Sequence, residues 1–143
     1  MRFIESIFGT LLLVTVAWAD LTSIKEVPNP EKRADMAMDY GGKMLLEVRE
    51  KFSKHDMKQL EIALAEFRGA LELTVDSLKA TGKDPSKNPR AHKKVELRLR
   101  EFMRKLKTME HDLDFEDRAM IKPVIDRVGQ IQDDLVQGIF SKK

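Results

Sequence analysis

The sequence predicts an all-α protein, an up-down-up-down four-helix bundle preceded by a signal peptide and a short extended lead-in. Three observations lead to this fold class. Glycine and proline are scarce (7 and 5 of 143 residues) and charged residues make up 35%, a composition typical of helical proteins. Four long stretches repeat apolar residues at alternating intervals of three and four, the period of one helix face. The connections between these stretches are short, as in antiparallel bundles.

The composition also narrows the classes of function. The formal net charge of +2 is nearly balanced, so the overall charge does not require a polyanionic partner. The sequence contains no cysteine, which excludes disulfides, thiolate zinc sites and c-type haem attachment. The folded chain must therefore be stabilised by packing alone.

Residues 1–19 predict a secretory signal peptide. A basic residue at the second position is followed by an apolar core over residues 7–16 and by Ala17 and Ala19, which form an A-x-A cleavage site. The alternative is an uncleaved membrane anchor, but the apolar run is shorter than the about 20 residues that a spanning helix needs. We therefore expect cleavage after Ala19 and a soluble mature protein in the periplasm or outside the cell.

The mature chain is expected to begin with an extended lead-in over residues 20–29, which show no sustained hydrophobic period, and to form the bundle over residues 30–140. Asn29 as N-cap and Pro30 at the first helical position mark the start of a helix that runs to about Ser53. Its expected buried stripe is Ala34, Ala37, Gly41, Met44, Val48 and Phe52.

Two adjacent glycines, Gly41 and Gly42, lie inside this first helix. Each costs about 1 kcal/mol relative to alanine in a helix interior. The hydrophobic period runs through the pair in phase, so we interpret the glycines as a point of close approach by a neighbouring helix. The alternative is a local break in the helix.

The second helix is expected over residues 57–81, between Asp56 as its N-cap and Gly82 as the residue beyond its C-terminus. The connection from the first helix is so short that the two must form an antiparallel hairpin. The expected buried stripe of the second helix is Leu60, Leu64, Phe67, Leu71, Thr74 and Leu78.

The third helix follows a polar loop, KDPSKNP. Asn88 and Pro89 repeat the Asn-Pro start, so the helix is expected from Pro89 to about Asp112. Its apolar residues follow a heptad pattern: Val95, Leu99, Phe102, Leu106, Met109 and Leu113.

Asp114 is expected to cap the fourth helix, with Asp117 placed to complete the cap. Pro123 lies within its hydrophobic pattern and is expected to kink the helix rather than end it. The apolar residues of this helix are Met120, Ile121, Val124, Val128, Ile131, Leu135 and Ile139.

Charge is partitioned among the helices. Residues 56–76 carry five acids and two bases (net −3), residues 90–107 carry two acids and eight bases (net +6), and residues 110–134 carry eight acids and three bases (net −5). A basic helix between two acidic ones is expected to fix which helices become neighbours.

The strongest candidate site is the outer face of the third helix. Four cations lie on it more than a quarter turn from the buried seam, at 100° per residue, and Leu97 lies among them. These four cations are Lys93, Arg100, Arg104 and Lys107. Such a face can bind an acidic protein or an anionic surface. The alternative is a solvated face steadied by pairs of Glu96 with Arg100 and Glu101 with Lys105.

No catalytic, cofactor or metal site is expected. No histidine lies three or four residues from another, and the acid-rich run over residues 110–117 lacks the glycine of a calcium loop. Met36 and Met38 point about 200° apart on a helix and cannot share one ion. The fourth helix contains no histidine to ligate haem, and no nucleophile lies in a recognisable pattern with a base. Nucleic acid is not expected as a partner, because no aromatic residue interleaves the cations.

Several resemblances concern the mature chain. Residues 51–73 resemble a tetratricopeptide hairpin, with His55 and Asp56 at the usual Gly-Asp turn. In size and basic character the chain is similar to secreted all-helical chaperones of the Spy and CpxP type, although their LTxxQ motif is not completed after Leu21 and Thr22. As a whole it resembles small secreted bacterial all-helical proteins with no assigned activity, a resemblance that implies a fold and a compartment only.

The expected function is therefore that of a secreted or periplasmic, non-catalytic helical bundle that binds another protein, or a second copy of itself. The alternative is a periplasmic chaperone-like or anionic-surface-binding protein that uses the basic outer face of the third helix. Contact with a membrane is expected only through an uncleaved signal segment or through weak electrostatic attraction.

Overall fold

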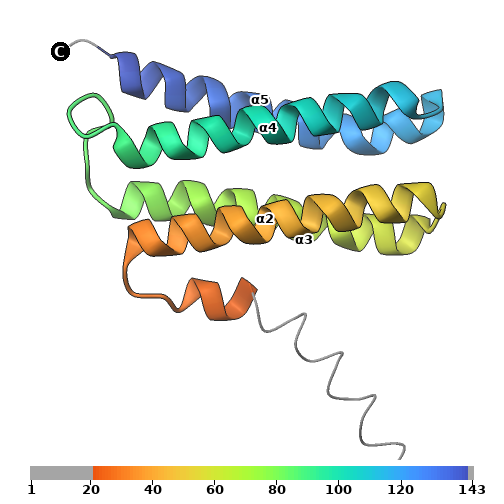
Figure 1. Cartoon of the computed structure of the whole chain (residues 1–143), viewed down its shortest axis with the longest axis horizontal. Coiled ribbons are helices and arrows are strands. Elements are labelled where there is room, and N and C mark those ends of the chain that lie inside the picture. The colour runs from red at the N-terminus through yellow and green to blue at the C-terminus, as the bar shows by residue number, and fades with distance from the viewer. Residues whose placement is uncertain (1–20, 142–143) are drawn as a thin grey trace, which may run out of the picture.

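Helices are the only regular secondary structure in residues 21–141, the part of the chain that the computed structural model describes. Four long helices, α2 (Pro30–Ser53), α3 (Met57–Ala80), α4 (Arg90–Asp112) and α5 (Phe115–Phe140), account for most of it (Figure 1). The all-α prediction is thus confirmed. The predicted signal peptide, with its cleavage site at Ala17 and Ala19, lies outside the described residues.

The prediction of an extended lead-in is wrong for residues 21–25, which form a short helical segment. This segment packs against the outside of the α2–α3 hairpin (Figure 1). Ile24 is buried there with Ala37, Tyr40 and Ala70, in a cluster separate from the main core. Burial of Ile24 against another element supplies the stabilisation that a segment this short lacks by itself.

The first two long helices have the capping residues that the sequence predicts. The Asn29 Oδ1 accepts hydrogen bonds from the backbone N–H groups of Glu31 and Lys32, at 3.0 and 3.1 Å. The Asp56 carboxylate accepts from the N–H of Gln59 at 3.2 Å and caps α3. Gly82, with a φ of +66°, follows the C-cap of α3 in the left-handed conformation that glycine favours.

At the other two long helices the predicted side-chain caps do not form. Pro89, not Asn88, occupies the N-cap position of α4, and no side chain caps that helix. Asp114 does occupy the N-cap position of α5, but its side chain makes no capping hydrogen bond, so a capping box with Asp117 does not form. The α4–α5 turn is held instead by Arg118, whose Nε donates to two carbonyl oxygens at the end of α4, at 2.9 and 3.0 Å.

The helices form two hairpins, α2–α3 and α4–α5, stacked as two layers (Figure 1). Between the layers, α4 packs beside α2 and α5 packs beside α3. Lys94 of α4 pairs with Asp35 of α2, and Arg98 pairs with Asp39, both 59 residues apart. This constant separation shows that α2 and α4 run parallel.

This arrangement overturns the expectation that basic α4 lies between two acidic helices. Its neighbours are acidic α5 and α2, which carries five acids and five bases. The loop between α3 and α4 runs from one layer to the other at one end of the structure (Figure 1). The acidic α3 lies diagonally opposite α4, since α4 packs beside α2 and α5 packs beside α3.

One buried core lies among the four long helices. Leu64, Leu99 and Val128, from α3, α4 and α5, belong to this single cluster and are at most 6% exposed. The rings of Phe67 and Phe102 meet edge to face across the diagonal, with centroids 5.5 Å apart. The predicted stripes therefore do face one another.

The close approach predicted at the glycine pair is confirmed. A Cβ placed on Gly41 would lie 3.6 Å from the Cβ of Ala70 on α3 and 3.5 Å from the ring of Phe102 on α4. Small residues on both helices of the first hairpin let α2 and α3 pack closely, whereas large side chains fill the space between the two layers.

Candidate functional site

The basic outer face of α4 is a continuous stripe of exposed side chains. Its members are spaced four, three, four and three residues apart, which keeps them on one side of a helix. All five are exposed: Lys93, Leu97, Arg100, Arg104 and Lys107. Leu97, with 59% of its surface exposed, is the apolar centre of a cationic surface. The structure thus places the predicted residues together.

Arg100 is the member of this stripe that has an ion-pair partner. Its Nε lies 2.6 Å from the Oε1 of Glu96, whose side chain is only 6% exposed. Gln132 of α5 donates to the same oxygen at 3.4 Å. Arg100 therefore neutralises a buried carboxylate, which is costly to leave unpaired.

The second pair that sequence predicts on this helix also forms, between Lys105 and Glu101 at 3.1 Å. The hydrogen bond from Lys105 lowers the pKa of Glu101. Within residues 21–141, Lys93, Arg104 and Lys107 have no ion-pair partner within 4.0 Å. Both ion pairs that the solvated-face alternative names therefore form, and three cations of the face keep their charge available.

A second candidate site lies where the loop over residues 81–89 meets the N-terminal turns of α2 and α4. These segments enclose a groove of about 590 Å³. Four cations line it, Lys83, Lys87, Arg90 and Lys94, together with two acids, Glu31 and Asp35. Sequence reasoning did not single out this groove, although the cation-rich run KDPSKNPR beside a helix start was a signal for it.

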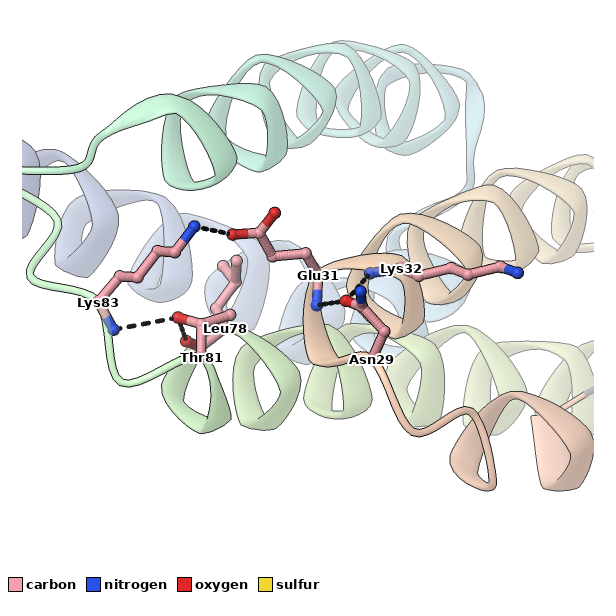
Figure 2. A network of polar contacts seen from close by, with 6 residues as sticks. All are labelled: Asn29, Glu31, Lys32, Leu78, Thr81 and Lys83. Carbon is pink, nitrogen blue, oxygen red and sulfur yellow. Dashed lines mark hydrogen bonds and ion pairs between the residues drawn. The ribbon is translucent and has the colours of Figure 1, made fainter.

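Hydrogen bonds hold the loop that forms this groove in place. Figure 2 shows Lys83 reaching from the loop to the carboxylate of Glu31 at the start of α2, while the backbone N–H of Lys83 donates to Thr81 Oγ1 at 3.3 Å. The Thr81 hydroxyl in turn donates to the carbonyl of Leu78 at 2.6 Å. The contact with Lys83 lowers the pKa of Glu31. The carboxylate is therefore ionised near neutral pH and offsets the charge of Lys83.

The described part of the chain offers no other obvious centre of chemistry. Among residues 21–141, no three histidine or acidic side chains lie close enough together to hold a metal ion. In the same range, none of the helices has the length and apolar character needed to cross a membrane. His92, buried in α4, has a pKa lowered by burial.

No protein-family model, curated protein or solved structure gives a significant match to the chain. The outer face of α4 and the groove at its start are therefore the features that point to a function.

Proposed function

We propose that this protein is an exported, non-catalytic four-helix bundle that binds an acidic protein partner through the outer face of α4. The observation that carries this proposal is the exposure of Leu97 among four cations, of which Lys93, Arg104 and Lys107 have no ion-pair partner in the described structure. Protein interfaces place an apolar anchor at the centre and charged residues at the rim. The cations select an acidic partner and raise the rate of encounter, and Leu97 supplies the desolvated contact.

The buried pair beneath this face determines which variants test it. Reversing Arg100 would leave two carboxylates beside each other, one of them the buried Glu96, and would destabilise the fold as well as the surface. Lys93 and Arg104 have no such partner in the described structure, so Lys93→Glu and Arg104→Glu change the surface charge with little effect on stability.

The test is site-specific photocrosslinking in the envelope of the producing cell. A photoreactive residue at Leu97 should yield a discrete adduct, which the double variant Lys93→Glu, Arg104→Glu abolishes. The same probe at Ile62, a 44% exposed apolar position on α3, serves as the control and should not yield that adduct. An adduct that persists in the double variant, or that forms equally from Ile62, would refute the assignment of this face.

A second candidate is an anionic membrane surface, favoured by the same cations. Electrostatic attraction to lipid depends on charge, at about 1 kcal/mol per basic residue near the surface, whereas a protein anchor depends on the apolar residue. Leu97→Ser should therefore abolish capture of the protein partner yet leave flotation with phosphatidylglycerol vesicles unchanged. Strong vesicle binding that Arg104→Glu removes would support the membrane instead of the protein partner.

The sequence of residues 1–19 is the basis for proposing export. The mass of the mature chain tests this proposal, because cleavage removes these residues. Cleavage after Ala19 would leave Asp20 at the N-terminus, directly before the helical segment that holds Ile24 against the hairpin. Recovery of a full-length protein from the cytoplasm would refute this part of the proposal.

A further inference from the structure

The groove at the start of α4 carries an excess of positive charge. Two of its four cations are neutralised within the groove, Lys83 by Glu31 and Lys94 by Asp35, the latter at 3.1 Å. The remaining two, Lys87 and Arg90, have no ion-pair partner within 4.0 Å in the described structure. The groove therefore has a net charge of about +2 near neutral pH.

The backbone adds donors to the same groove. The first N–H groups of a helix have no partner within the helix, and those of α4 receive no side-chain cap. Arg90 and Ala91, the first two residues of α4, line the groove. In α2, by contrast, the Asn29 side chain already accepts from the corresponding groups. The start of α4 thus keeps both its N–H donors and its partial positive charge.

The dimensions of the groove match a small molecule rather than a macromolecule. Its volume of about 590 Å³ lies within the range of roughly 300–1,000 Å³ that is usual for ligand sites. Ala34, Ala91 and Val95 contribute an apolar part to its lining. A ligand with one highly charged end and a short carbon body would meet both kinds of surface.

We infer that this groove binds a small phosphate monoester, with Lys87 and Arg90 as the cations that pair with the phosphate. A phosphate monoester carries a charge of about −1.5 to −2 at pH 7 and presents three acceptor oxygens. That charge balances the two cations of the groove that have no ion-pair partner. The phosphate oxygens can accept hydrogen bonds from the guanidinium of Arg90 and from the backbone N–H groups at the start of α4. The groove shares no residue with the outer face of α4, so this inference and the proposed function stand or fall separately.

The experiment is a titration of the ¹⁵N-labelled protein over residues 20–143, followed by NMR. The titrants are glycerol 3-phosphate, inorganic phosphate and neutral glycerol. Glycerol 3-phosphate should shift the amide signals of Arg90 and Ala91 and should bind more tightly than inorganic phosphate, while glycerol should shift neither. Lys87→Met and Arg90→Met should each weaken binding roughly tenfold or more, as expected for loss of a charged hydrogen bond.

A matched control distinguishes binding in the groove from general attraction of the phosphate to cations on the protein surface. Lys32 lies in the first turn of α2 next to Glu31, but its side chain points away from Glu31 and Lys83 (Figure 2). Lys32→Met should leave the affinity for glycerol 3-phosphate unchanged. An equal loss in Lys32→Met, an unchanged affinity in both groove variants, or no shift at Arg90 and Ala91 would each overturn the inference. Circular dichroism of each variant verifies that it remains folded.

Discussion

Replacement of Phe102 by alanine should be among the most destabilising single changes in this protein. Its side chain is 1% exposed and joins the two layers, edge to face with Phe67 at 5.5 Å, and the guanidinium carbon of Arg98 lies 5.7 Å from the ring centroid. Truncation of a buried phenylalanine costs about 3–5 kcal/mol, of which the aromatic pair accounts for about 0.5–1.5 kcal/mol. A cost of about 4 kcal/mol is a large part of the about 5–15 kcal/mol that stabilises a typical domain.

The assay is urea unfolding of the chain over residues 20–143, followed by circular dichroism at 222 nm. With a slope of about 2 kcal/mol per molar urea, Phe102→Ala should lower the midpoint by about 2 M. Phe140→Ala, at a position that is 73% exposed, is the control and should have little effect. Equal midpoints for the two variants would refute the packing of the two layers described here. A double-mutant cycle with Phe67→Ala should show a coupling of about 0.5–1.5 kcal/mol.

Three further predictions concern single residues. Gly41→Ala should raise the free energy of unfolding by about 0.5–1 kcal/mol, because the new Cβ would meet its neighbours at 3.5 Å or more and alanine favours the helix; a lower urea midpoint would contradict this. Burial lowers the pKa of His92, so the unfolded chain binds more protons below about pH 6.5. Stability should therefore fall from pH 7 to pH 5, and His92→Leu, but not His111→Asn, should reduce that dependence. Glu72→Gln should cost about 0.5–1 kcal/mol at pH 7, because Arg127 pairs with both carboxylate oxygens and lowers the pKa of Glu72; this cost should shrink as the pH falls below 4.5, and a cost that stays constant as the carboxylate is protonated would contradict it.

Helix ends illustrate what local signals can and cannot predict. Asn29, Asp56 and Gly82 act as expected because each works through residues only a few positions away in the chain. The same reasoning failed at Asn88 and Asp114, where the residue types are right but no side-chain cap forms. At the α4–α5 turn, a guanidinium that reaches the carbonyls at the end of α4 replaces the expected cap.

The apolar stripes were predictable as well, but the neighbours of each helix were not. The hydrophobic period defines which side of a helix is buried, but that side can pack against any neighbouring helix of suitable shape. The loop over residues 81–89 can join α3 either to an adjacent helix or to one across the diagonal, and the structure has the second arrangement. Tyr40 and Ala37 are also buried outside the main core, because residues 21–25 cover them.

The two candidate sites also differ in how far the sequence predicts them. Sequence alone determined the outer face of α4, because the angle between two side chains on one helix depends only on their separation in the chain. The groove around Lys87 and Arg90 was decided by the tertiary structure, since its lining comes from α2, α4 and the loop between α3 and α4. Distances between segments that are far apart in sequence follow from how the two hairpins pack, and that packing depends on side-chain shape across the whole core.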